Sequence, residues 1–329
     1  MATVFSSYDE PLGPRSDRYF GDGYKKVSPD LTTLRIARST GPGAEHRGVA
    51  RLSYPAAWSR KQHGELVPHV SSVDTIMLAA ALCDAAITHT RDLNSEEAGR
   101  MWVRHASVRS GASPHIDLDN IPVTAAVTAT AESEDDESET TFAFRVGNLS
   151  GSMTIVHPIG IGPLTVPGYD RIETLHEIHG PRPHYYLDGV KDHTLSATHI
   201  VVDDQATRIT GRHRVNAGVE GGYSGAESAH WNSVSPIDLI VGAAQLSQIL
   251  LYRMDGLNRA KSNTLWMRKL EFVTDGPHRL ADDEFDGTVE IRRAPVIDRG
   301  GQRWRSADLL IKEFRGLTGS CLLAHQIPD

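Results

Sequence analysis

The stretches "VSSVDTIMLAAAL" (Val70–Leu82) and "VSPIDLIVGAAQL" (Val234–Leu246) have almost the same sequence. In each, a serine is followed three residues later by an aspartate, Asp74 or Asp238, and this spacing is typical of a capping box at the start of a helix. The residues that follow are apolar on nearly every side, so each helix should be buried over most of its surface. The two stretches therefore predict two long core helices, each capped by its own serine.

The similarity extends beyond these helices, because other short matches recur in the same order about 164 to 168 residues apart. The matched pairs are Gly13–Arg15 with Gly180–Arg182, Lys25 with Lys191, Trp102–Arg104 with Trp266–Arg268, Asn148–Ser152 with Gly316–Ser320, and His157 with His325. An offset of half the 329 residues indicates a duplicated chain with two similar halves, 1–165 and 166–329. The Pro- and Gly-rich stretch His157–Asp170 lies across the join and predicts a connection.

Strand-like segments follow and precede each predicted helix, and several alternate apolar and polar residues. They cover 48–54, 102–109, 121–131, 140–146 and 151–157 in the first half, and 198–202, 206–215, 265–273, 288–293, 307–312 and 319–325 in the second. A long helix wrapped by a curved antiparallel sheet is the hot-dog arrangement. The sequence thus predicts an α+β fold, a double hot-dog of two tandem repeats packed tightly together. Edge-to-edge pairing of the two sheets would also hide two strand edges.

The composition is ordinary for a globular protein, with 39% hydrophobic and 23% charged residues. Six of the carboxylates that make the formal net charge −8 fall within Glu132–Glu139, which we interpret as a solvated hairpin tip; a docking surface for a basic partner is the alternative. Because the rest of the chain is nearly neutral, we expect no nucleic-acid partner.

Cysteine usage and hydropathy indicate the compartment. Cys83 and Cys321 lie in apolar stretches and are expected to be buried free thiols, as in a reducing cytoplasm. The first residues lack the basic and apolar regions of a signal peptide, and the longest fully apolar run is about eight residues. We therefore expect a cytoplasmic protein, outside the membrane, that is a monomer or a homodimer.

The N-terminal "LGPRSDRYFGDGYKKV" (Leu12–Val27) and the helix starts "SSVDTIMLAAALCDA" and "SPIDLIVGAAQLSQ" resemble the avirulence D (AvrD) family along nearly the whole chain. The duplicated helix motif is also similar to that of the A-factor synthase (AfsA) family, whose two hot-dog repeats carry a related motif of proline and aspartate before the helix. The first resemblance implies a role in making syringolide-like acyl glycosides and butenolides. The second implies transfer of a β-ketoacyl group to a hydroxyl of a small phosphorylated carbonyl compound.

Together the resemblances imply a syringolide- or butenolide-type synthase, an acyltransferase that condenses a β-ketoacyl thioester with a ketose such as xylulose or its phosphate. The donor would be carried by acyl carrier protein or coenzyme A, and the activated methylene would then close onto the ketone. This chemistry requires no cofactor. Two alternatives stay open: a hot-dog thioesterase, dehydratase or hydratase that acts on acyl thioesters, and a non-catalytic protein that binds an acyl ligand.

The candidate catalytic residues cluster near the two helix starts. Acyl transfer needs a base for the hydroxyl proton and donors for the oxyanion, and Asp74 and Asp238 stand at helix N-termini where both could meet. Helix capping alone is the alternative for both aspartates. His69 and His230 precede the helices and have no histidine at the equivalent place in the other half, so either is a candidate base; a structural role is the alternative.

Candidate substrate-binding residues lie upstream of the helices. His63 precedes the first helix, and Trp231 could stack on a sugar or line an acyl tunnel, with core packing as the alternative. Arg182 and His184, in "GPRPHYYLDG", could hold a phosphate, and Arg15 is the equivalent of Arg182. A Gly-Pro turn with a structural arginine is the alternative there. No His/Cys cluster in the sequence has zinc spacing, so we expect no metal.

Overall fold

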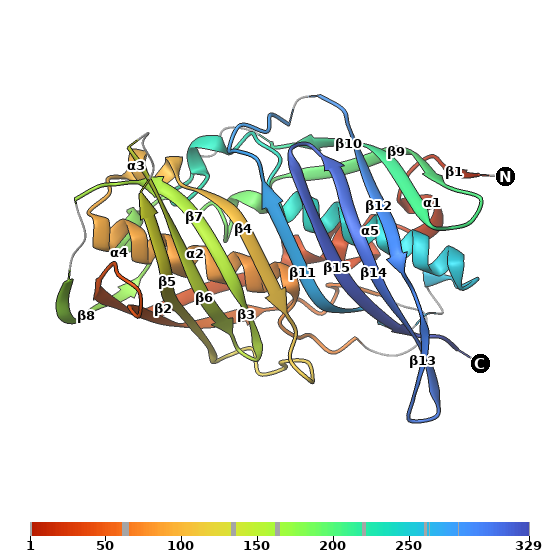
Figure 1. Cartoon of the computed structure of the whole chain (residues 1–329), viewed down its shortest axis with the longest axis horizontal. Coiled ribbons are helices and arrows are strands. Elements are labelled where there is room, and N and C mark those ends of the chain that lie inside the picture. The colour runs from red at the N-terminus through yellow and green to blue at the C-terminus, as the bar shows by residue number, and fades with distance from the viewer. Residues whose placement is uncertain are drawn as a thin grey trace.

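A computed structural model of the chain shows two long helices lying against one continuous antiparallel sheet of 15 strands (Figure 1). It describes residues 2–60, 66–132, 136–161, 165–218, 222–259, 262, 264–281 and 283–328. The helices are α2 (Ser72–Arg91) and α5 (Pro236–Met254), and the expected α+β architecture is confirmed. By length and composition alone α2 could cross a membrane, but almost all of it is buried inside the protein, as in a core helix.

The strands follow the chain in two sets. The first set is β2 (Ser28–Ser39), β3 (Glu45–Ser53), β4 (Trp102–Arg109), β5 (Ile121–Glu132), β6 (Glu137–Val146) and β7 (Leu149–Pro158). The second set is β9 (Thr194–Val202), β10 (Arg208–Asn216), β11 (Trp266–Thr274), β12 (Phe285–Arg293), β13 (Val296–Arg299), β14 (Gln302–Phe314) and β15 (Leu317–Gln326). Two further strands, β1 (Thr3–Phe5) and β8 (Thr165–Thr174), lie at the two ends of the sheet.

Counted inward from either end of the sheet, equivalent strands of the two halves follow in the same order. The order is β1-β9-β10-β12-β14-β15-β11-β4-β7-β6-β5-β3-β2-β8, and the remaining strand, β13, pairs with β14 outside this order. The repeated strands β4 and β11 meet in the middle and pair antiparallel, with Ser107 opposite Glu271, which is its own equivalent 164 residues later. An approximate local two-fold axis therefore passes between these two residues. The predicted pairing of the two sheets into one is confirmed.

The segments that precede β2 and β9 cross over between the halves. We call residues 8–26 the first arm; it contains α1 (Asp9–Leu12), η1 (Arg15–Asp17), η2 (Tyr19–Gly23) and η3 (Tyr24–Lys26). We call residues 175–191 the second arm; it contains α4 (His176–His179) and η4 (Gly189–Lys191). The first arm contacts α5, whereas α4 of the second arm contacts α2.

The strands that lead into the arms are exchanged in the same way. Strand β1 pairs with β9 at the second-half end of the sheet, and β8 pairs with β2 at the first-half end. Figure 1 shows the green β8 beside β2 at the left, whereas the red N-terminal strand lies at the right. Each half therefore places a strand and an arm on the other half, and the arms cover the core helices.

The core explains why the two helices have so little polar surface. Residues such as Ile76, Leu78, Leu82 and Leu246 are fully buried between the sheet and the arms. Each such side chain stabilises the fold by about 1.5–3 kcal/mol relative to exposure. The small residue Gly242 lets the Phe314 ring approach the helix backbone, since a Cβ there would lie 2.6 Å from the ring.

Most of the predicted elements are found, with one correction. Every predicted strand overlaps an observed one, and both cysteines are buried and free. Of the acidic run, Glu132 lies in β5 and Glu137 and Glu139 lie in β6, whereas residues 133–135 lie outside the described residues. The interpretation of His157–Asp170 as a connection is wrong, because β8 begins at Thr165 and pairs with β2. Pro167 and Gly168 are tolerated because β8 is an edge strand, where one row of backbone groups needs no partner.

Because the arms and end strands are exchanged, we expect the two halves to unfold together. Denaturation by urea should give one transition, with the same midpoint by far-ultraviolet circular dichroism and by tryptophan fluorescence. Trp102 lies in the first half and Trp304 in the second, so fluorescence reports on both. Two separated transitions would show that the halves are independent units.

Candidate functional site

Both repeated aspartates form the capping boxes predicted for them. The Ser71 hydroxyl accepts from the Asp74 backbone N–H at 3.1 Å, and the Asp74 carboxylate accepts from the Ser71 N–H at 2.9 Å. Ser235 and Asp238 repeat this geometry at 3.1 and 2.8 Å. Such a cap contributes about 1 kcal/mol to helix stability. The capping role is thus confirmed for both, and their catalytic role stays a prediction.

Asp74 is covered by two phenols. Tyr54 donates to its Oδ2 at 2.6 Å, and the Tyr19 hydroxyl lies 2.5 Å from the Ser71 hydroxyl. Burial and the adjacent carboxylate raise the pKa of both tyrosines well above the usual value, so both phenols stay protonated.

Asp238 has a different partner, the buried imidazole of His193. His193 Nδ1 lies 2.7 Å from Asp238 Oδ2, and His193 Nε2 lies 2.9 Å from the Trp231 carbonyl oxygen. Both neighbours present oxygen acceptors to the ring nitrogens, and this placement favours the protonated form of the ring. Burial alone would lower the pKa of His193, but the Asp238 carboxylate outweighs burial and raises it. The result is a buried ion pair at the start of α5.

The first arm brings more polar groups to this helix start. Lys25 Nζ donates to the His193 carbonyl oxygen, and the Tyr24 phenol lies close enough to Asp238 for the carboxylate to raise its pKa, after the larger effect of burial. Asp238 Oδ1 is buried and has no hydrogen-bond partner among the described residues. This oxygen is the one carboxylate atom of the pair that could accept from a ligand or a water.

A cavity of about 150 Å³ begins one helical turn beyond Asp238 and follows the surface of α5. Its walls are the first arm, β9 and the helix itself, from Val241 to Gln245. Tyr24 lines it as well, and its charged residues are Arg15, Arg18 and Asp9. Of the residues predicted for the site, Arg15 is the one that lines this cavity.

Two arginines make the cavity suitable for an anion. Arg18 is buried, donates to the Gln245 side-chain oxygen at 2.5 Å and forms an ion pair with Asp9. Burial lowers the pKa of Arg18, and the nearby charge of Arg15 adds to this effect. Arg15 is partly exposed and pairs with Asp22 at 2.9 Å. A phosphate or a developing oxyanion in the cavity would relieve the repulsion between the two guanidinium groups.

One residue of the cavity wall, Tyr8, contacts the buried His213. The Tyr8 hydroxyl lies 2.6 Å from His213 Nε2, and Tyr8 is a wall of the cavity. Burial lowers the pKa of His213 to about 4, so its ring is neutral at pH 7 and can accept a proton. Tyr8 can donate to this nitrogen while its oxygen accepts from a bound hydroxyl.

The two halves differ at this pair. His46 is the equivalent of His213, 167 residues earlier, and is also buried and neutral. The residue that corresponds to Tyr8 is Leu175, and each of the two is the N-cap of the short helix that opens its arm. The first half therefore keeps the histidine but has no phenol to connect it to a cavity.

The second arm places a different cluster on α2. The fully buried Asp84 accepts from His184 Nε2 and from the Ala226 backbone N–H, both at 2.8 Å. His179 Nε2 lies 3.6 Å from the same carboxylate oxygen. His184, predicted as a phosphate ligand, is thus a buried partner of an aspartate, whereas Arg182 is exposed.

The other predicted residues lie outside the cavity walls. His69 is half-buried beside Trp266, and its Nδ1 lies 3.0 Å from the Val67 carbonyl oxygen. His230 packs edge-on against His278, and burial lowers its pKa to about 4. Trp231 is half-buried and packs on the core. His63 lies outside the described residues.

A larger hollow of about 450 Å³ lies on the exposed face of the first-half strands. Its charged residues are Arg109 and Arg145, and it holds no acid–base pair. It is open to solvent, so we place the candidate site in the smaller cavity, where burial strengthens electrostatic contacts.

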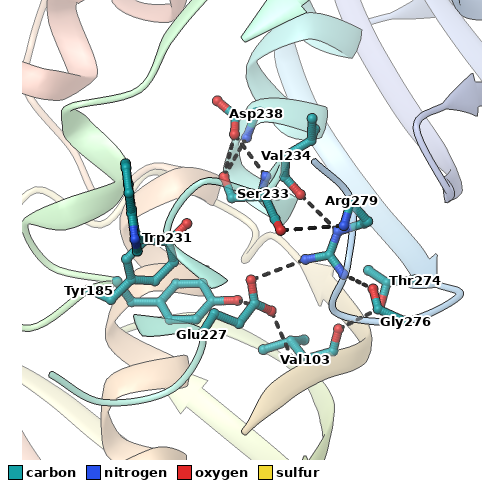
Figure 2. A network of polar contacts seen from close by, with 12 residues as sticks. Val103, Tyr185, Glu227, Trp231, Ser233, Val234, Asp238, Thr274, Gly276 and Arg279 are labelled. Carbon is teal, nitrogen blue, oxygen red and sulfur yellow. Dashed lines mark hydrogen bonds and ion pairs between the residues drawn. The ribbon is translucent and has the colours of Figure 1, made fainter. Parts of the chain in front are cut away.

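A buried ion pair connects the loops around the α5 start (Figure 2). Glu227 Oε2 accepts from Arg279 at 3.2 Å, and Glu227 Oε1 accepts from the Val103 N–H and the Tyr186 hydroxyl, each at 3.0 Å. Arg279 also donates to the Val234 carbonyl oxygen at 2.8 Å. Through these bonds, strand β4 of the first half is held to two loops of the second.

Sequence reasoning did not find Tyr8, Arg18, His193, His213 or Gln245. The histidines at 46 and 213 were a usable signal, because they share an offset of 167 with the repeat. The contrast between Tyr8 and Leu175 follows from the same alignment. Nothing in the sequence links the remaining three to one another, since the first arm meets α5 only in the folded chain.

The chain belongs to the Pseudomonas avirulence D protein (AvrD) family. The family model matches residues 3–328, which is nearly all of the sequence. This match confirms the resemblance seen in the first arm and at the two helix starts. A comparison with curated proteins finds no match to the sequence.

Several solved structures have a distant likeness in shape to this AvrD family member. A tesB protein of Mycobacterium avium subs paratuberculosis has 11% identity and a TM-score of 0.40, over 86% of this chain and 93% of that one. A putative thioesterase from Novosphingobium aromaticivorans has 12% identity and a TM-score of 0.37, over 93% of this chain and 96% of that one. A conserved protein of unknown function with hot dog fold from Alicyclobacillus acidocaldarius has 11% identity and a TM-score of 0.37, over 95% of this chain and 99% of that one.

Buried neutral histidines should make the protein unstable in acid. Burial lowers the pKa of His46, His157 and His213 from 6.5 to about 4. Between these values the unfolded chain binds more protons, so this stabilisation is complete above pH 6.5 and is lost as the pH falls toward 4. We expect the free energy of unfolding to fall by several kcal/mol across this window. Urea titrations at each pH measure it, and a free energy that is constant from pH 7 to pH 5 would contradict the assignment.

Removing the charge of Glu227 should be costly. In Glu227→Gln the Arg279 guanidinium keeps its charge in a buried place without a counterion, so we expect a loss of about 3–5 kcal/mol in the free energy of unfolding. Glu271→Gln is the control, because Glu271 pairs with Lys269 on the partly exposed side of the sheet and should cost at most about 1 kcal/mol. Equal losses of unfolding free energy in the two variants would show that the buried Glu227–Arg279 pair contributes no more than the partly exposed pair.

Proposed function

We propose that this AvrD family member is an acyltransferase that joins a β-ketoacyl thioester to a hydroxyl of a ketose or ketose phosphate, with the cavity along α5 as its active site. The observation that carries the proposal is the arrangement of one cavity wall. There the first arm places the Arg15 and Arg18 guanidinium groups and the Tyr8 phenol around a volume of about 150 Å³, and the Tyr8 hydroxyl contacts the buried His213 on β10. These are the groups that an acyl transfer to a phosphorylated alcohol requires.

The proposal includes the architecture of two tandem hot-dog repeats, residues 1–165 and 166–329, each built on one core helix. The palindromic strand order and the pairing of Ser107 with its equivalent Glu271 support it. The exchanged arms form the covers of the helices, so one repeat supplies the arm and the other the helix of the same cavity. A complete site thus requires both repeats.

The proposed first step is attack of the ketose hydroxyl on the thioester carbonyl carbon. The hydroxyl proton passes to Tyr8 as the Tyr8 proton passes to His213, and a C–O bond forms. The C–S bond then breaks and releases a thiolate. The thiolate takes a proton from Tyr8, which recovers its own proton from His213. Arg18 faces the developing oxyanion, and Arg15, at the solvent side, binds the phosphate when the ketose carries one. Asp238, His193 and Lys25 hold the helix start next to Tyr24 and so position the inner wall.

The proposed second step is closure of a ring. The methylene between the two carbonyls of the transferred acyl group is acidic, attacks the ketose carbonyl carbon, and leaves a butenolide after loss of water. The donor is a thioester of coenzyme A or of acyl carrier protein, and the protein acts in the cytoplasm. A hot-dog thioesterase or dehydratase would use the same cavity with water in place of the sugar, and a binding protein would hold the acyl group without turnover.

The test is an assay with a β-ketoacyl thioester and a panel of ketoses and ketose phosphates, read by mass spectrometry. A joined product that depends on the sugar is expected. Tyr8→Phe should lower kcat by roughly 10²–10⁴-fold, because it removes the proton transfer. Arg15→Gln should raise KM for a ketose phosphate about tenfold or more and leave that for the free ketose nearly unchanged.

Matched controls separate these effects from general damage. Tyr169→Phe removes a hydroxyl from an exposed strand, and Arg214→Gln removes an exposed charge next to His213 in the sequence; neither should change activity. Free β-keto acid formed without any sugar would replace the proposal with a thioesterase. Tight acyl binding without turnover would indicate a ligand-binding protein.

A further inference from the structure

Three buried ligand atoms meet where the second arm crosses α2. They are Asp84 Oδ2 from the middle of the helix, His179 Nε2 from the last residue of α4, and His184 Nε2 from the turn after it. All three atoms lie within 4.8 Å of one another, and all three residues are buried. We propose that these residues form a binding site for one divalent transition-metal ion of the zinc class, separate from the cavity along α5.

The distances fit such an ion. A tetrahedral zinc with bonds of about 2.0–2.1 Å separates its ligand atoms by about 3.3 Å. Asp84 Oδ2 lies 2.8 Å from His184 Nε2 and 3.6 Å from His179 Nε2, on either side of this value. A site with two imidazoles and one carboxylate suits zinc and other late first-row transition metals better than calcium or magnesium, which prefer oxygen ligands.

His179 supplies an independent observation. Its Nε2 is buried, points toward Asp84 Oδ2 and has no hydrogen-bond partner within the part of the chain that the structure describes. A buried nitrogen without a partner costs about 1–3 kcal/mol. Coordination by that nitrogen would remove the cost, whereas the His184–Asp84 hydrogen bond leaves it in place.

Gly225 leaves space next to the ligand atoms. A Cβ at this position would lie 2.4 Å from both Asp84 Oδ2 and His184 Nε2, and the residue has a φ of +80° that favours glycine. An atom bound to both ligands would therefore meet the hydrogens of a glycine and not a side chain. The fourth position of the ion is available to a water molecule, as in zinc sites with three protein ligands.

The carboxylate is already oriented for coordination. The Ala226 N–H donates to Asp84 Oδ2 at 2.8 Å, and Thr88 Oγ1 donates to Asp84 Oδ1 at 3.0 Å. Such outer bonds hold a ligand in place and are typical of metal sites. The ligands come from positions 84, 179 and 184, so no local spacing in the sequence reveals the site. The ion would connect α2 of one half to the arm of the other.

The test measures metal content and does not depend on the proposed acyl transfer. Full-length protein is stripped with a chelator, incubated with Zn²⁺, separated from free metal and analysed by mass spectrometry of the metal. About one Zn²⁺ per chain is expected, and His179→Gln should lower the affinity about tenfold or more. His176→Gln is the matched control, because His176 is on the same short helix but exposed, and it should bind like the unchanged protein.

Each outcome bears on the proposal even if His179→Gln does not fold. Unchanged protein that retains no Zn²⁺ overturns it, and so does equal retention by His179→Gln, which would indicate surface sites. Co²⁺ added to the unchanged protein should give the intense visible absorption of a four- or five-coordinate ion. The weak spectrum of hydrated Co²⁺ would overturn the proposal as well.

Discussion

The antiparallel pairing of β4 with β11 is the contact on which the rest of the molecule depends. Its register places Ser107 opposite its own equivalent, Glu271, so the two halves face each other through a local two-fold relation. This relation brings α2 and α5 into contact and lets each arm reach the helix of the other half. A shift of one residue would place the inner face of one strand beside the outer face of the other and remove that geometry.

The two helices have different polar surroundings. Along α5 the first arm leaves a cavity with Arg15, Arg18 and the Tyr8–His213 pair, whereas on α2 the second arm closes over Asp84 with two histidines. Both halves bury a histidine at equivalent places in the sequence, His46 and His213.

Burial acts on the histidines in opposite directions according to their partners. His213 has no carboxylate beside it, so burial keeps the ring neutral. His193 is just as buried, yet the Asp238 carboxylate and the Trp231 carbonyl oxygen favour the charged ring and raise its pKa. The pKa of the same side chain is thus lowered in one place and raised in another.

The sequence by itself determined the two capped core helices, the α+β class and most of the strands, because these follow from periodicity and from short-range capping chemistry. It also named Arg15, which lines the cavity along α5. Only the tertiary structure decided that the arms cross, that Tyr8 meets His213, and that Asp84 meets His179 and His184. These contacts join residues 95 to 205 positions apart, and no local pattern specifies which distant arm will cover a helix.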